Sequence, residues 1–438
     1  MTRDDQRISL IGSVSLGTGV MIGAGIFALV GQVAEISGAV FPWVFLAAAV
    51  VVGLSSHAYA RYSAVNPTSG GIAMLLRAAY GNGVVAGAFS LFMYVSMVVA
   101  ESLIARTFGT YLLQPFGLQD SVILVPLLGV LLIAATAIAN IVGNRFVERS
   151  ATATAVIKIV GIATLAIAGI IGTVVASGGG ASSSGETTGG EGGGGATGDA
   201  GLLGIVAGVA LCVLAYKGFT TITNHGAELR DPKKNLPRSI VLAIVICAGL
   251  YALITVAVAA NLTVPEIVEA RDFALARAAD PLFGQAGVAL AVGIAVIATA
   301  SALRANLFSV SRLFAMLQDM GQVPRGSRWK EQQPLLITAG LAIVVTVLFD
   351  LGQIASLGVF LYLTMDIAVQ WGVLRRLRGD TGAHAWPLVA TIVFDGIILG
   401  AFTIVTIGRD PLTLLVASVI GAALFLSQWL VVRHARAE

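Results

Sequence analysis

The sequence predicts an all-α integral membrane protein with about twelve transmembrane helices. Of its 438 residues, 57% are hydrophobic and only 11% are charged, whereas a soluble domain carries roughly 25% charged residues. Apolar runs long enough to cross a bilayer recur along the whole chain, and lysine and arginine gather in alternate connecting segments. These observations place the chain in the membrane class.

The predicted spans follow from the apolar runs, since about 20 mostly apolar residues cross a bilayer as a helix. In order, the runs are 9–33, 38–60, 84–113, 121–143, 151–177, 202–226, 238–260, 284–310, 334–349, 353–374, 386–407 and 411–432. The ninth and tenth are separated by only a few residues around Asp350. The polar start, MTRDDQRISL, precedes the first run, and no small-residue cleavage site follows it, so we expect this span to be retained.

The positive charges predict the orientation of the spans. With twelve spans and a cytoplasmic N-terminus, 19 of the 26 lysines and arginines fall inside, and only Arg271, Arg277 and Arg409 fall outside. This asymmetry fits the positive-inside rule. We therefore predict a multi-pass protein of the plasma (inner) membrane with both termini in the cytoplasm.

A Gly/Ser-rich segment divides the chain after the fifth predicted span. Residues 178–201 are of low complexity and are expected to form a flexible extracellular loop. Five spans precede the loop, in residues 1–177, and seven follow it. The sixth to tenth spans, in residues 202–378, match the first five in number, and the last two occupy 379–438. The spacing is that of a five-plus-five inverted repeat with two extra helices, all within one membrane transport domain.

The first and sixth spans contain helix-breaking or polar residues in matching places. The first carries IGAGI, Ile22, Gly23, Ala24, Gly25 and Ile26, and the sixth carries AYKGF, Ala215, Tyr216, Lys217, Gly218 and Phe219. Interrupted helices form the binding sites of many secondary transporters, because freed backbone groups can contact substrate. We expect both helices to be discontinuous, with a carboxylate held at IGAGI. The alternative is that GVMIG is a small-residue pattern for close helix packing.

Several ionisable side chains fall inside the spans, where charges are costly and mark functional candidates. They are Glu101, Arg106, Lys158, Lys217 and Arg304. Lys158 lies about eight residues into the fifth span, roughly 12 Å deep at 1.5 Å per residue. It either exchanges protons or extends to the cytoplasmic interface, and Arg304 is expected in a structural ion pair. No metal site or cofactor is expected, and the dipeptide Gly-Lys of a phosphate-binding loop does not occur.

Four motifs together resemble the amino acid permeases of the amino acid–polyamine–organocation (APC) superfamily. They are GTGVMIGAGIF in the first span, NPTSGGIAMLLRAAYG at 66–81, AYKGFTTITNHGAELRDPKKNLPRSI at 215–240, and SALRANLFSVSRLFAMLQDMGQVP at 301–324. They occur in the family's order and cover most of the chain, while the last two spans match only in hydropathy. The resemblance implies the inverted-repeat fold of the leucine transporter.

The resemblance also implies roles for particular residues. The substrate carboxylate would lie on Gly23, Ala24, Gly25 and Ile26, and the amino group near the carbonyls of Leu214, Ala215 and Lys217. Lys158 matches the lysine that takes the place of a sodium ion in proton-coupled members. Leu214 stands where members often carry an aromatic gate, which leaves Tyr216 or Phe219 as alternatives.

The predicted function is import of an amino acid by alternating access, with a proton as co-transported ion. The implied partners are the amino acid, protons and the lipid bilayer, with no nucleic acid. An exchanger that moves no proton is the main alternative, and a channel is a remote one. An enzyme is not expected, because no H-E-x-x-H motif is present and the four histidines are scattered.

Overall fold

The computed structural model describes residues 7–67, 71–142, 147–178, 201–324 and 332–435, and these are almost entirely helical. Their only β-type pairing is an isolated bridge between Ile8 and Leu229. Ten stretches are long and apolar enough to cross a membrane. The chain is therefore an α-helical, multi-pass membrane protein, as predicted. The loop predicted at 178–201 lies almost wholly outside the described residues.

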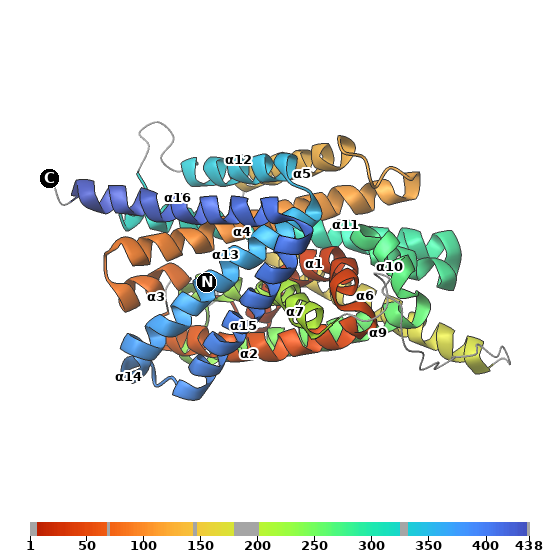
Figure 1. Cartoon of the computed structure of the whole chain (residues 1–438), viewed down its shortest axis with the longest axis horizontal. Coiled ribbons are helices and arrows are strands. Elements are labelled where there is room, and N and C mark those ends of the chain that lie inside the picture. Colours follow the sequence, from red (N-terminus) through yellow and green to blue (C-terminus); the bar gives the residue numbers. More distant parts are fainter. Residues whose placement is uncertain (1–6, 68–70, 143–146, 179–200, 325–331, 436–438) are drawn as a thin grey trace.

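A helix lies over each of the twelve predicted ranges (Figure 1). The helices over the first six are α1 (Leu10–Ser37), α2 (Phe41–Val65), α4 (Val84–Leu113), α5 (Leu124–Val142), α6 (Val147–Gly178) and the pair α7 (Leu202–Tyr216) and α8 (Phe219–Asn224). Those over the last six are α9 (Pro232–Asn261), α11 (Ala274–Asp319), α12 (Gln333–Leu348), α13 (Leu351–Gly372), α15 (Ala385–Arg409) and α16 (Pro411–Ala435).

Short helices connect several of these long ones. They include α3 (Gly71–Tyr80), α10 (Val264–Glu269), α14 (Arg378–Thr381) and the one-turn segments η2 (Gly38–Val40) and η5 (Arg271–Phe273). The long α11 is two helices joined at a kink, where Gly284 adopts φ 55° and ψ −143°. A residue with a side chain is strained in such a conformation, so glycine permits the kink. The predicted eighth span begins at this residue.

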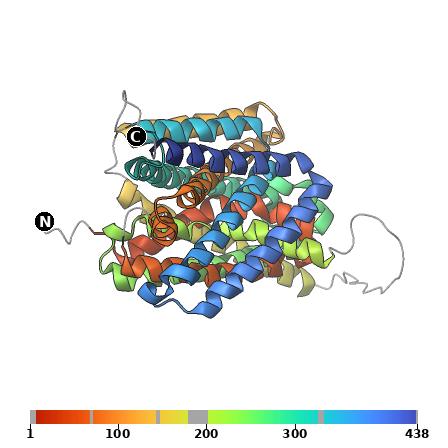
Figure 2. The same cartoon turned by 60° about the vertical axis from the view of Figure 1, so that its left-hand side comes forward.

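The first helix forms the centre of the bundle. It packs against α6, α7, α8, α9 and α11, and Figures 1 and 2 show it enclosed by other helices. By contrast, α5, α12, α15 and α16 expose many large apolar side chains, among them Leu131, Val344, Ile397 and Leu415. An apolar outer surface of this kind suits contact with lipid. Polar groups near α1 are thus removed from both lipid and water.

Candidate functional site

The sixth predicted span is interrupted between Tyr216 and Phe219, as predicted. Lys217 and Gly218 form a tight turn there, with φ/ψ of −57°/−21° and −55°/−17°. The backbone nitrogen of Thr220 donates to the Lys217 carbonyl at 3.0 Å, three residues back instead of four. Such tight turns inside a helix often mark functional sites. The break leaves α7 and α8 as two helices that share one wall of the site.

The predicted break in the first span is wrong, because α1 is continuous from Leu10 to Ser37. Its glycines serve close packing instead. A Cβ added at Gly23 would lie 2.0 Å from the Ala302 Cβ of α11, and one at Gly25 would lie 2.7 Å from the Ala215 Cα of α7. Glycine costs about 1 kcal/mol relative to alanine in a helix, and the approach of neighbouring helices offsets that cost. The backbone N–H groups of Ile22 to Ile26 therefore lie within a helix and form no open carboxylate cradle.

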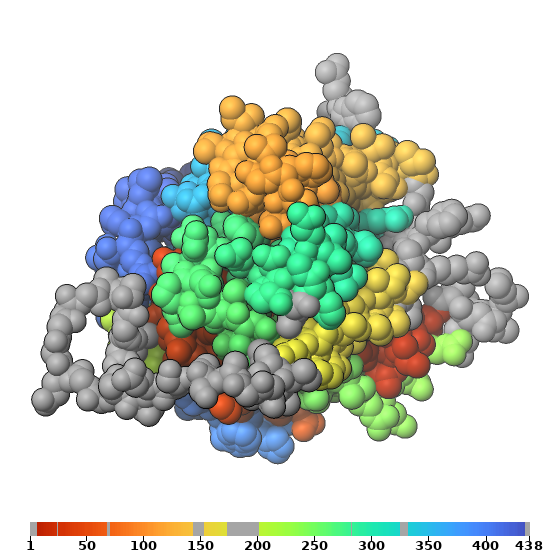
Figure 3. Space-filling model, turned by 90° about the vertical axis from the view of Figure 1, so that its right-hand side faces the viewer, coloured from red at the N-terminus to blue at the C-terminus, as the bar shows by residue number. Residues whose placement is uncertain are grey.

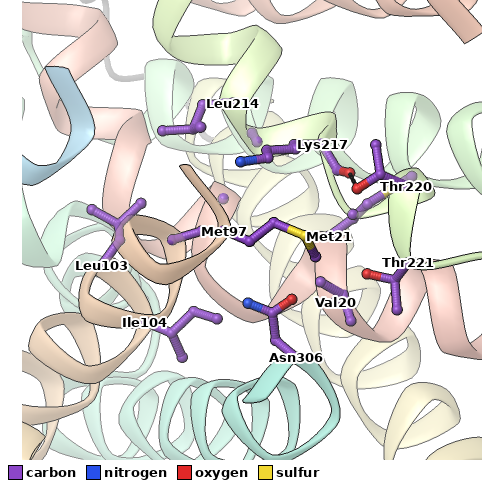
Figure 4. Close-up of a pocket in the computed structure, with 14 residues that line it drawn as sticks. Val20, Met21, Met97, Leu103, Ile104, Leu214, Lys217, Thr220, Thr221 and Asn306 are labelled. Carbon is purple, nitrogen blue, oxygen red and sulfur yellow. Dashed lines mark hydrogen bonds between the residues drawn. The ribbon is translucent and has the colours of Figure 1, made fainter. Parts of the chain in front are cut away.

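A small cavity lies where α1, α4, α7, α8 and α11 meet (Figure 4). Five of the predicted binding residues line it, namely Gly25, Leu214, Ala215, Lys217 and Gly218. The other lining residues are Val20, Met21, Met97, Ala100, Leu103, Ile104, Thr220, Thr221 and Asn306. The structure thus brings the centre of the first span and the break in the sixth to one place.

Other predicted binding residues lie away from this lining. The Tyr216 hydroxyl donates to the Phe45 carbonyl of α2 at 3.2 Å, and Phe219 packs edge-on against Tyr59 with ring centroids 5.4 Å apart. Both aromatic residues thus face α2, and neither covers the cavity as a gate. Ile22, Gly23 and Ile26 are likewise absent from the lining.

The cavity is small and mostly apolar. Its volume is about 40 Å³, enough for a few waters, whereas ligand pockets usually measure about 300–1,000 Å³. The sequence analysis did not single out Asn306, which also lines the cavity. An amide side chain inside the apolar eighth span is a signal that could have identified it. In Figure 4 its side chain points toward the space that Met21 and Met97 border. A larger substrate requires the surrounding helices to move apart.

Lys217 reaches across the bundle from the break in the sixth span. Its amino group donates a hydrogen bond to the Ser96 hydroxyl of α4 and lies 5.1 Å from the centre of the Tyr362 ring of α13. Only 5% of Lys217 is exposed. A buried amine needs such partners, because burial without hydrogen bonds is costly.

We expect loss of the Ser96 hydroxyl to destabilise the protein more than replacement of Lys217 does. Ser96→Ala leaves a buried amine without its oxygen partner, which costs about 1–3 kcal/mol. Lys217→Met removes the amine and keeps the volume, and it leaves only a neutral hydroxyl without its partner, which costs less than a buried amine without one. Thermal melts of both purified variants measure this difference, and a lower midpoint for Lys217→Met than for Ser96→Ala contradicts it.

Lys158 lies inside the bundle and not at the interface. It is 1% exposed, and its Nζ donates to the Gly19 carbonyl of α1 at 2.7 Å. Gly19 precedes Val20 and Met21, which line the cavity. The lysine therefore connects α6 to the helix that forms one wall of the cavity.

The other predicted intramembrane charges do not form ion pairs with one another. Both carboxyl oxygens of Glu101 are buried without a hydrogen-bond partner in the described part of the chain, and Arg106 Nε donates to the Thr346 carbonyl at 2.8 Å. Arg304 Nε is buried and without a partner among the described residues. The ion pair predicted for Arg304 is thus not seen there.

The two ends of α1 are tied to neighbouring segments by charged groups and backbone bonds. Near its start, the backbone of Ile8 pairs with Glu228 and Arg230, and Glu228 contacts Arg312 of α11 at 2.5 Å. Near its end, Glu35 contacts both Arg271 and Arg409 at 3.2 Å. Figure 3 shows the face around this second end, where α10 and α11 (green) fill the centre. Both ends of α1 are thus held by contacts to neighbouring segments.

Fold and site together define a multi-pass membrane transporter whose interrupted helix borders a central cavity. The sequence model of the family described as amino acid permease matches residues 8–425. The chain therefore belongs to the amino acid permease family, whose members are transporters and not enzymes.

Individual proteins agree with this assignment. The chain is 31% identical over 405 residues to the Escherichia coli inner membrane transport protein YbaT, covering 90% of each chain. It is 23% identical to the Bacillus subtilis serine/threonine exchanger SteT, covering 87% of this chain and 86% of the relative. A mutant manganese transporter of Eremococcus coleocola matches with a TM-score of 0.63 over 97% of this chain and 93% of its own. Its 15% sequence identity supports the fold alone.

Proposed function

We propose that the protein imports an amino acid by alternating access and couples this movement to a proton through Lys158. The observation that carries the proposal is the hydrogen bond from Lys158 Nζ to the Gly19 carbonyl of α1. Loss of a proton removes the positive charge of this amine and weakens the hydrogen bond that it donates to the carbonyl. The change therefore acts directly on the helix that borders the cavity, and membership of the amino acid permease family supports the substrate class.

The proposed substrate site is the cavity between α1 and the α7–α8 break. Interrupted helices in transporters present free carbonyls and N–H groups to substrate. Here the break supplies Leu214, Ala215 and Lys217, and α1 supplies the Gly25 surface opposite them. Because the cavity is only about 40 Å³, we propose that α1 and α8 separate from α4 and α11 when substrate enters.

The packing of the helices supports a five-plus-five repeat. Helices that occupy equivalent places in the two proposed repeats pack against each other, in the pairs α1 with α7, α2 with α9, α4 with α11 and α5 with α12. We propose repeats at 1–177 and 202–378, followed by two further helices in 379–438. We also propose the plasma membrane as the location, with both termini in the cytoplasm, as the charge distribution predicts.

The experiment that tests this function is uptake into proteoliposomes containing the purified chain. Over a panel of radiolabelled amino acids, we expect an inward proton gradient to raise the initial rate for at least one of them. An inward sodium gradient of equal size is the matched control and should leave that rate unchanged. Initial rates that respond to neither gradient contradict symport.

An exchanger is the alternative that one finding favours, the similarity to a protein named serine/threonine exchanger. It would use the same cavity and move no proton. Liposomes preloaded with unlabelled amino acid distinguish the two mechanisms. Uptake that requires preloading and ignores the proton gradient supports exchange.

A further inference from the structure

A pair of buried carboxyl groups lies outside the cavity, between α2, α13 and α15. Asp366 belongs to α13 and Asp395 to α15, and each is 1% exposed. Asp395 lies ten residues after the start of α15 at Ala385, roughly 15 Å along the helix. Carboxyl groups buried inside membrane-spanning helices are costly and therefore need an explanation.

Asp366 is surrounded by hydrogen-bond donors. The Ser55 hydroxyl of α2 donates to Asp366 Oδ2 at 2.6 Å, and the Tyr59 hydroxyl donates to Oδ1. Gln370, one turn further along α13, donates its Nε2 to the same Oδ1 at 3.3 Å. A carboxyl group that accepts several hydrogen bonds is stabilised in its ionised form. Both carboxyl oxygens of Asp366 thus accept hydrogen bonds from neighbouring side chains.

Asp395 has the opposite environment. Neither of its carboxyl oxygens receives a hydrogen bond from a described residue. Its side chain interacts with that of Asp366 across the packed helices α13 and α15. In a dry site two adjacent carboxylates repel each other strongly, because neither solvent nor a counter-ion offsets their repulsion, so the pair releases its last proton only with difficulty.

The charged surroundings provide no cation for the pair. The titratable groups that interact with it are Tyr59 of α2 and Tyr362 of α13. Lys217 contacts the ring of Tyr362, but its amino group donates its hydrogen bond to Ser96 and not to either aspartate. No lysine, arginine or histidine in the described ranges forms an ion pair with either aspartate. No cation among the described residues therefore balances negative charge on the pair. A bound proton or another small cation is left to do so.

We propose that Asp366 and Asp395 form a proton-binding site, separate from Lys158, that holds one exchangeable proton. The proton resides on Asp395, which donates it in a hydrogen bond to the ionised Asp366. Loss of the proton leaves two adjacent negative charges, which push α13 and α15 apart. The site does not depend on the proposed role of Lys158 or on the identity of the substrate.

The pair is connected to the break in the sixth span by two aromatic side chains. Tyr59, which donates to Asp366, packs edge-on against Phe219 at the start of α8. Tyr362 lies one turn before Asp366 on α13 and beneath the amino group of Lys217. Movement of the pair on release of its proton therefore reaches both sides of the Lys217–Gly218 turn.

Infrared difference spectroscopy of the purified full-length chain tests the proposal directly. A protonated carboxyl group has a C=O stretching band distinct from that of a carboxylate, and the band shifts in D₂O. We expect the wild-type band to disappear between acidic and alkaline buffer. Asp395→Asn should lack the band at every pH, because Asp366 then stays ionised. Asp366→Asn should keep it at every pH, because a single buried carboxyl group stays neutral.

Glu101→Gln is the matched control, since it removes another buried carboxyl group without touching the pair. Its spectrum should retain the band that titrates in the wild type. The constant contribution of Glu101 is the difference between the wild-type and Glu101→Gln spectra. Once it is subtracted, a wild-type band that persists into alkaline buffer, or one unchanged in Asp395→Asn, overturns the proposal. Loss of the band on addition of sodium at constant pH also overturns it, in favour of a metal-ion site. The two asparagine variants give opposite spectra, so poor folding of one leaves the other as a test.

Discussion

Lys158→Ala is expected to abolish the stimulation of uptake by a proton gradient. The substitution removes the hydrogen bond of 2.7 Å between Nζ and the Gly19 carbonyl, and with it this polar contact between α6 and α1. We expect the gradient-driven initial rate to fall at least about tenfold, which corresponds to about 1.4 kcal/mol. Exchange between labelled and unlabelled amino acid should persist, because it needs no net proton movement.

Initial rates in proteoliposomes, recorded with and without the gradient over a range of pH, measure this effect. Lys234→Ala is the matched control, because Lys234 lies exposed near the start of α9 and does not line the cavity. It should behave as the wild type does. If the Lys158→Ala protein keeps the wild-type pH profile, the proton-coupling role is contradicted and the lysine has a packing role only.

Gly25→Val is expected to abolish uptake by separating the two walls of the cavity. A Cβ at this position would lie 2.7 Å from both the Cα and the Cβ of Ala215 and 2.9 Å from its carbonyl oxygen. Part of that obstacle is backbone, which cannot rotate away. Overpacking of a core typically costs about 1–3 kcal/mol, so the melting temperature should fall together with transport.

Gly19→Ala provides the control for Gly25→Val on the same helix. An added Cβ at Gly19 has no atom within 4 Å, and alanine favours a helix by about 1 kcal/mol over glycine. We therefore expect the alanine variant to be at least as stable as the wild type. Equal melting temperatures and uptake rates for the two variants would refute close packing as the role of Gly25.

The fold was largely predictable because hydropathy and charge report directly on membrane spans. The break at Lys217–Gly218 was also predictable, since a lysine and a glycine interrupt an apolar run there. The break at Gly23–Gly25 was predicted wrongly, because helix propensity is a weak prior that packing overrides. The sequence does not show that Ala302 and Ala215 press against these two glycines.

The acidic pair shows a second limit of prediction from sequence. Asp366 and Asp395 each lie inside a predicted span, and an acidic residue in such a place is a signal in itself. What the sequence does not show is that the two side chains meet, since they belong to different helices. Likewise, the donors Ser55 and Tyr59 come from α2, far earlier in the chain. Hydrogen-bond partners from distant segments become visible only in three dimensions.

The glycines of α1 also have a consequence for biosynthesis. The helix is translated first, yet the residue that fits against Gly23 is Ala302, which is made much later. At about 5–20 residues per second, the interval is roughly 15–55 s. During that time α1 can pack against α2 and α6, but its Gly23 surface lacks its final partner. The earliest helix in the chain is therefore among the last to complete its contacts, and newly made chains are most open to mispairing at this surface.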